Sequence, residues 1–212
     1  MRHPNKYSKL IILLHFVSLA VLFISIVAFI KSSSNGTVFS ENNNSRIGVS
    51  GFTDLNKWSM DTDALNCDAS FVISDGRLKE INNLKFSTPI KSLKSTHAYM
   101  DTVVYNMLAV DGIKDITFEQ TKIMILPRMK MVNIIGDLTI WKVTRIIDLQ
   151  LVYHIKNDNE VSFIGLKKLD LHFFGITRKN PLLKNVKFDS QVLVQIEINL
   201  KNKKEIIAEN KV

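Results

Sequence analysis

The side chains best suited to catalysis in this chain are five histidines, and their spacing does not make a site. They are His3, His15, His97, His154 and His172. No two form the His-x-x-x-His pair that holds zinc on a helix, and neither a Gly-x-Ser-x-Gly turn nor a phosphate-binding glycine loop is present. His154 and His172 can approach each other across strands, but a solvent-facing position explains each equally well. We therefore predict a protein that is not an enzyme.

Cysteine chemistry is equally limited, because Cys67 is the single cysteine of the chain. One thiol cannot form an internal disulfide or a thiolate zinc site, which needs several ligands. Cys67 also lies too far from the apolar start of the chain to be a lipid-modified cysteine. We predict that it is a small buried apolar residue.

Positive charge is concentrated at the start of the chain. The first 31 residues carry four basic side chains and no acidic one, whereas the remainder carries 24 basic and 20 acidic side chains. This remainder is only mildly basic, which suits weak attraction to an anionic membrane surface. No segment shows the dense Lys/Arg stripe of a nucleic-acid-binding protein, so nucleic acid is not an expected partner.

An uncharged run of 21 residues, 10–30, is the most apolar part of the chain. As a helix it would be about 30 Å long, which matches the hydrocarbon thickness of a bilayer. The run is long for a cleavable signal peptide and lacks a small-x-small site, so residues 1–31 are predicted to be a transmembrane signal anchor. Arg2, Lys6 and Lys9 precede it, which places the N-terminus in the cytoplasm and the rest in the bacterial periplasm or otherwise outside. Cleavage would instead release the protein into the periplasm.

Beyond a Ser- and Asn-rich stretch, 32–45, which predicts a flexible linker, apolar and polar residues alternate with the period of half-buried strands. In 191–200, for example, Val192, Val194, Ile196 and Ile198 share one face. The pattern predicts strands at 47–51, 67–74, 78–87, 116–126, 133–141, 145–154, 161–173 and 191–200. A charged C-terminal tail, 202–212, follows.

One stretch, 96–110, has the spacing of an amphipathic helix, with Met100, Val103, Val104, Met107 and Leu108 on one side. We expect this helix to cover one end of the sheet, with its apolar stripe in the core rather than in a binding groove. Consecutive strands and short turns predict an all-β antiparallel barrel or sandwich with one or two short helices. A closed barrel of about eight strands is either filled by side chains or holds one small ligand.

Seven segments follow one another in a familiar order: GFTDLNKWSM (51–60), FSTPIKSLKSTHAYMD (86–101), VYNML (104–108), ITFE (116–119), GDLTIWKVTRIID (136–148), Gly165 and DLHFFGI (170–176). Over residues 46–201 they resemble the YceI-like family, the lipid- or polyisoprenoid-binding proteins. In one departure, Trp141, Lys142 and Val143 stand where the family usually has a glycine. The resemblance implies a lipocalin-like β-barrel domain that holds a long apolar chain, such as a polyprenyl lipid or isoprenoid quinone, in an exported protein.

Inward-facing side chains would form the binding site of such a barrel. The candidate lining residues are Phe86, Phe118, Leu138, Ile140, Leu149, Leu151, Val194, Ile196 and Ile198. Each of them can instead simply fill the barrel. A diphosphate or quinone head would need a cation or a donor at the mouth, for which Lys94, His97 and Arg145 are candidates, with a solvated surface charge as the plainer explanation. No metal is expected, and no cofactor beyond a bound isoprenoid lipid or quinone.

The sequence thus predicts a membrane-anchored, extracytoplasmic binding protein that holds an apolar lipid without catalysis. A barrel filled by side chains would instead be an interaction module for another envelope protein, and an enzyme acting on a lipid is the third alternative. A homodimer is compatible with each. A copurifying lipid separates the first function from the second, and covalent change of an added lipid separates the third from both.

Overall fold

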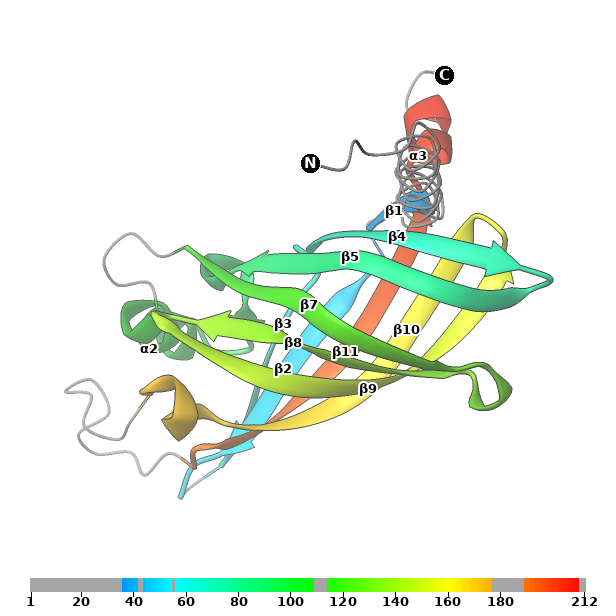
Figure 1. Ribbon diagram of the computed structural model, residues 1–212. Helices are drawn as coiled ribbons and strands as arrows, with labels where there is room; N and C mark the ends of the chain where they lie inside the picture. Colours follow the sequence, from blue (N-terminus) through cyan, green and yellow to red (C-terminus); the bar gives the residue numbers. More distant parts are fainter. Residues whose placement is uncertain (1–35, 42–43, 55, 109–113, 177–188, 210–212) are drawn as a thin grey trace, which may run out of the picture. The chain divides into compact units, whose positions relative to one another are not determined.

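The computed structural model describes residues 36–41, 44–54, 56–108, 114–176 and 189–209. Gly36–Val212 forms one compact unit (Figure 1). The predicted membrane anchor, 1–31, lies outside the described residues. Among the helices that are described, none has both the length and the apolar composition needed to cross a bilayer.

Strands make up most of the described chain. They are β1 (Thr37–Glu41), β2 (Arg46–Phe52), β3 (Lys57–Thr62), β4 (Asn66–Ser74), β5 (Arg77–Pro89), β6 (Lys94–Ser95), β7 (Asp115–Leu126), β8 (Met131–Ile140), β9 (Val143–Asn157), β10 (Glu160–Asp170) and β11 (Gln191–Asn202). The helices are α2 (Ala98–Leu108) and α3 (Lys203–Glu209), with 3-10 turns η1 (Ile90–Ser92), η2 (Pro127–Met129) and η3 (Leu171–Phe174). In β8 every second residue is buried, as expected for a strand with one face on a core.

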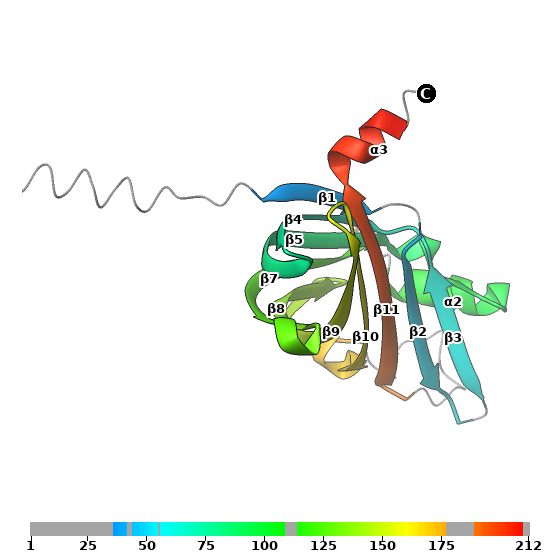
Figure 2. The same ribbon diagram turned by 90° about the vertical axis from the view of Figure 1, so that its right-hand side faces the viewer.

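Eight of the described strands close into an antiparallel barrel, in the order β1-β4-β5-β7-β8-β9-β10-β11, and β1 pairs with β11 to complete the ring. Strand β11 serves two neighbours, because residues 200–202 pair with β1 and residues 193–197 pair with β2. The strands β2, β3 and β6 therefore extend the sheet from β11 (Figure 2). The prediction of an all-β antiparallel barrel with one or two short helices is confirmed for the described chain, which has two.

Alternation predicts eight strands correctly, namely β2, β4, β5, β7, β8, β9, β10 and β11, and the predicted helix contains α2. It does not predict β1, β3 or β6, which are short or have few apolar residues. The predicted linker is wrong for residues 37–41, which form β1. One side chain explains this strand, since Phe39 is only 1% exposed and packs into the core.

The ends of two predicted elements are also corrected. Strand β10 ends at Asp170, not at 173, because the Asp170 carboxylate accepts a hydrogen bond from the His172 N–H at 2.9 Å and starts η3. In the predicted C-terminal tail, Lys203–Glu209 forms α3. The Asn202 side-chain oxygen accepts the Lys204 N–H at 3.1 Å and so caps this helix.

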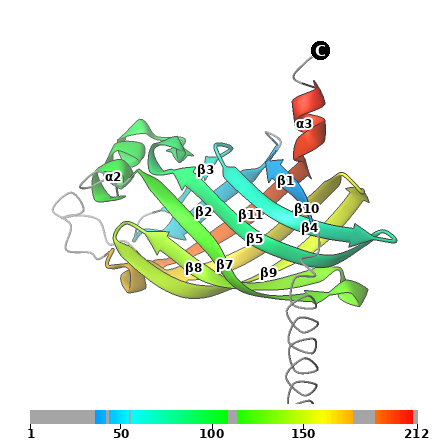
Figure 3. The ribbon, with the colours of Figure 1, turned by 45° about the horizontal axis from the view of Figure 1, so that its top comes forward.

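One end of the barrel is filled by aromatic side chains. Phe71 meets Phe39 edge-on, with ring centroids 5.0 Å apart, and stacks on Phe163 at 5.7 Å. Tyr153 lies beside Phe163, with centroids 6.5 Å apart. The β4–β5 hairpin and η2 lie at this end, whereas α2 and η3 lie at the other (Figures 1 and 3). We call these the filled end and the α2 end.

A tight turn at Trp141 and Lys142 joins β8 to β9 at the α2 end. Trp141 has a φ of 57°, in the left-handed region that favours glycine. This backbone conformation gives a physical reason for the glycine that the family pattern has here. In this chain the indole also packs on the segment after η3, where a Cβ added to Gly175 would lie 3.4 Å from Cζ3 of Trp141.

Candidate functional site

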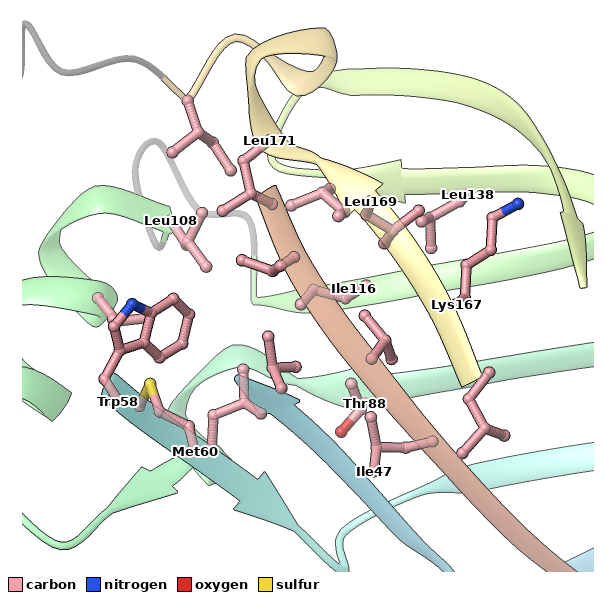
Figure 4. Close-up of a pocket in the computed structure, with 18 of the residues that line it drawn as sticks. Ile47, Trp58, Met60, Thr88, Leu108, Ile116, Leu138, Lys167, Leu169 and Leu171 are labelled. Atoms are coloured by element: carbon pink, nitrogen blue, oxygen red, sulfur yellow. The ribbon is translucent and has the colours of Figure 1, made fainter. Parts of the chain in front are cut away.

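The α2 end of the barrel encloses an apolar cavity of about 270 Å³. One water needs only about 10–15 Å³ of such space, so this end is hollow, which of the two alternatives left open by the sequence favours a barrel with room for a ligand. The wall is formed by inward-facing residues of β2, β3, β5 and β7–β11, together with α2 and η3 (Figure 4). Such a lining can hold an apolar chain but offers it few polar partners.

Helix α2 supplies one side of the wall. Met100, Val103, Val104 and Leu108 all line the cavity. The expectation that this stripe belongs to the core rather than to a groove is therefore only half right. Val103 and Leu108 are buried, as core residues are. However, they face the cavity and line its wall.

Hydrogen bonds with two residues in and just before β6, Ser95 and Leu93, hold α2 in place. The Asp101 carboxylate accepts hydrogen bonds from both the N–H and the hydroxyl of Ser95, each at 2.7 Å. These bonds hold the pKa of Asp101 below its ordinary value. The Tyr105 hydroxyl donates to the carbonyl oxygen of Leu93. The helix is thus tied to the start of β6 at two points one turn apart.

Six of the nine predicted lining residues lie on the cavity wall: Phe86, Leu138, Ile140, Leu149, Val194 and Ile196. The other three, Phe118, Leu151 and Ile198, are buried in the core but do not line the cavity. Phe118 stacks on Phe86 with centroids 5.1 Å apart and extends over Gly136, where an added Cβ would lie 2.4 Å from its Cζ. Contact of these residues with a ligand stays a prediction.

The three predicted head-group contacts, Lys94, His97 and Arg145, are exposed and do not line the cavity. The Lys94 amine lies 5.1 Å from the centre of the Tyr105 ring, a cation–π contact. Arg145 Nε donates to the Phe173 carbonyl at 2.9 Å and so ties η3 to β9. Binding of a head group by any of the three stays a prediction.

Sequence reasoning missed Lys167, which among the described residues is the one charged side chain on the wall. Lys167 lies on the same face of β10 as Phe163 and Leu169, so the alternation in the sequence already indicated that it points inward. Lys167 Nζ donates to Asp148 Oδ1 at 2.7 Å. This bond lowers the pKa of Asp148. The amine points away from the apolar side chains of the wall (Figure 4).

The described histidines do not form a site. His154 pairs with Ser162 on β10, whereas His172 follows the opposite end of that strand, so the approach between them that the sequence allowed does not occur. Over the described part of the chain, no group of three or more His, Cys, Asp or Glu residues could hold a metal ion. The prediction for Cys67 is confirmed, since this residue is a buried free cysteine.

A model of the YceI-like domain matches residues 41–200, whereas no match was found among the curated proteins. Of the solved structures, BcnA from Burkholderia cenocepacia has a TM-score of 0.61 and 12% identity over 73% of this chain and 95% of that chain. A polyisoprenoid-binding domain from Saccharophagus degradans, implicated in plant cell wall breakdown, has a TM-score of 0.61 and 10% identity over 79% and 99%. A YceI protein from Campylobacter jejuni has a TM-score of 0.52 and 17% identity over 64% and 80%.

At these identities the solved structures establish the fold alone. The family match is stronger evidence, because residues 41–200 include nine complete strands of the described structure, from β2 to β10, and most of β11. The segments that carried the resemblance in the sequence lie inside this range. The chain therefore belongs to the YceI-like family.

Proposed function

We propose that this chain is a membrane-anchored, extracytoplasmic binding protein that holds an apolar isoprenoid-type lipid and performs no catalysis. The hollow apolar cavity at the α2 end carries the proposal. Its ligand would be a polyprenyl lipid or an isoprenoid quinone, whose tail needs contact with apolar surface and no fixed polar partner.

The composition of the wall supports a binding role. Burial of apolar surface stabilises a complex by about 25 cal/mol per Å², so a long hydrocarbon tail can bind tightly without hydrogen bonds. One of the few hydroxyls on the wall, that of Thr88, already donates to the Ala64 carbonyl at 2.7 Å. A general acid and base next to a nucleophile, as acyl or phosphoryl transfer would need, is not found among the described wall residues.

Relatives support the class of ligand. The similar domain from Saccharophagus degradans is a polyisoprenoid-binding domain, and its fold covers most of this chain. An isoprenoid tail is flexible and branched, and a cavity built from Leu, Ile, Val and Met side chains presents a surface of matching chemistry. The alternative of an interaction module supposed a filled barrel, and the cavity removes its main support.

The membrane anchor and the extracytoplasmic location rest on the sequence of residues 1–31. A tether would keep the barrel close to the bilayer that supplies an isoprenoid lipid. Protease added to intact spheroplasts should digest the barrel while a cytoplasmic marker survives. Protection of the barrel until the cells are lysed would contradict the proposed orientation.

Native mass spectrometry of the full chain, extracted gently from bacterial membranes, tests lipid binding. We expect one bound species that is released on denaturation, extracts into organic solvent and fragments as an isoprenoid. The variant Val194→Trp inserts an indole into the cavity and should lose this species. Leu193→Trp is the matched control, because Leu193 is the preceding residue of β11 and is 37% exposed on the outer face.

A ligand-free mass for the wild type, unchanged after incubation with polyprenyl lipids and quinones, would overturn the proposal. A search for a protein partner would then follow. Covalent conversion of an added lipid would instead show an enzyme.

A further inference from the structure

Backbone pairing between β9 and β10 covers only part of the two strands. Hydrogen-bonded pairs join these strands from Glu160 and Asn157 to Gly165 and Leu151. Beyond Gly165, β10 continues to Asp170 paired with β11, and before Leu151, β9 runs from Val143 paired with β8. Residues 143–150 and 166–170 are therefore strand segments that do not pair with each other, and we call this stretch without backbone pairing the β9–β10 seam.

Both ends of the seam are fixed. At one end, an added Cβ on Gly165 would lie 2.7 Å from the Gln150 carbonyl oxygen, so the two backbones are in close contact there. At the other end, Arg145 Nε donates to the Phe173 carbonyl at 2.9 Å and joins β9 to η3. The seam is thus an unpaired stretch with contacts at both of its ends, rather than the fraying of two strand ends.

One ion pair crosses the seam. Lys167 faces the cavity, whereas Asp148 lies between the wall residues Ile147 and Leu149 and so points to the outer face. The Asp148 side chain is accordingly 58% exposed. The bond of 2.7 Å from Lys167 Nζ to Asp148 Oδ1 therefore joins an inward-facing residue to an outward-facing residue on a neighbouring strand. It passes through the place where backbone pairing is missing.

This arrangement suits the polar end of an amphiphile. A tail in the cavity leaves its head needing water or a polar partner, because a polar group buried without one is costly. Lys167 lines the cavity and its side chain is 23% exposed, so it places a cation between the apolar interior and solvent. The present partner of that cation is a carboxylate that is mostly in water, so exchange of this carboxylate for another anion costs little.

We propose that the β9–β10 seam is the head-group site of the cavity, and that Lys167 selects an isoprenoid lipid with an anionic end, a phosphate or a carboxylate, which replaces Asp148. The inference rests on the proposed lipid binding and adds the chemical class of the head. Hydrogen bonds from an ammonium to such an anion are short and about twice as strong as neutral ones.

The test compares farnesyl phosphate with farnesol, which share one isoprenoid tail. The delipidated full chain in a non-ionic amphipol is titrated with each by calorimetry. The wild type should bind the phosphate more tightly, and Lys167→Met should weaken phosphate binding about tenfold relative to farnesol binding. Asp148→Asn removes the competing carboxylate and should strengthen phosphate binding. Lys168→Met, the next residue and exposed on the outer face, is the matched control and should change neither affinity.

Farnesol binding also reports that each variant is folded. Equal affinity of the wild type for both ligands, or an equal loss of both in Lys167→Met, would overturn the head-group assignment and leave lipid binding intact. Binding of neither ligand by the wild type would instead overturn both the assignment and the proposed function.

Discussion

The thiol of Cys67 illustrates how burial decides the chemistry of a single residue. Cys67 is 3% exposed, and burial, with smaller effects of the Asp68 and Glu41 carboxylates, raises its pKa to about 12. The thiolate is the reactive form of cysteine, and the folded protein holds almost none of it near neutral pH. The sequence predicted this residue correctly, because an isolated cysteine within an apolar–polar alternation has few other roles.

We expect the native protein to resist maleimide at Cys67 and to react fully in urea, with the mass of the protein as the measurement. Asp68→Cys is the control, since Asp68 is the next residue and is exposed, and this variant should be labelled once in the native state. Rapid labelling of the native wild type would show that β4 opens from the barrel.

A glycine in the middle of β8 makes a second residue-scale prediction. A Cβ added to Gly136 would lie 2.4 Å from Phe118 Cζ and 2.5 Å from the Glu119 carbonyl oxygen, so Gly136→Ala should lower the free energy of unfolding by about 1–3 kcal/mol. Gly48→Ala is the control, because its nearest contact would be Gln195 Cβ at 3.7 Å. Urea unfolding compares the two, and equal stabilities of the variants would show that Phe118 repacks freely.

At the scale of elements, alternation indicates the face of a residue but not its depth along the barrel. Leu149 and Leu151 share the inward face of β9, yet only Leu149 lines the cavity. Depth depends on strand register and on the aromatic residues that fill the other end, and one sequence specifies neither. Lys167 was missed for a different reason: the alternation placed it on the inward face, but a lysine is readily taken for a solvated side chain.

Helix α2 gives the prediction that belongs to this scale. Its main polar tie to the sheet is Asp101, which accepts two hydrogen bonds from Ser95. Asp101→Ala should speed hydrogen exchange of α2 while leaving the exchange of β8 unchanged. Asn106→Ala, an exposed change on the same helix, should leave α2 protected. Unchanged exchange in Asp101→Ala would mean that apolar contacts alone hold the helix.

The same tie depends on pH in a defined direction. The folded pKa of Asp101 is lowered by its hydrogen bonds with Ser95, so the stabilisation is complete above the ordinary aspartate pKa and is lost as the pH falls through the lower, folded value. Exchange of α2 in the wild type should therefore rise in acid relative to that of β8. In Asp101→Ala this difference should show no such acid dependence.

At the scale of the whole molecule, the two ends of the barrel differ in packing: aromatic side chains fill one end, and the α2 end contains the cavity. The filled end supplies stability: Phe39 is 1% exposed and packs against Phe71, so Phe39→Ala should lower the free energy of unfolding by about 3–5 kcal/mol. The α2 end contributes less packing energy, because side chains that face a void lack van der Waals contacts on that side. A lipid bound as proposed would restore those contacts and stabilise the folded state by mass action.

The two ends should therefore respond in opposite ways. In Phe39→Ala, the delipidated protein should melt at a lower temperature than the wild type but still gain stability when an isoprenoid lipid is added. In Val194→Trp, the indole partly fills the void, so the delipidated protein should melt close to the wild type and gain nothing from lipid. Thermal unfolding of both variants with and without lipid makes the comparison. Loss of the lipid effect in Phe39→Ala would contradict this division between the two ends. It would show that the cavity keeps its shape only when the aromatic side chains of the filled end are packed.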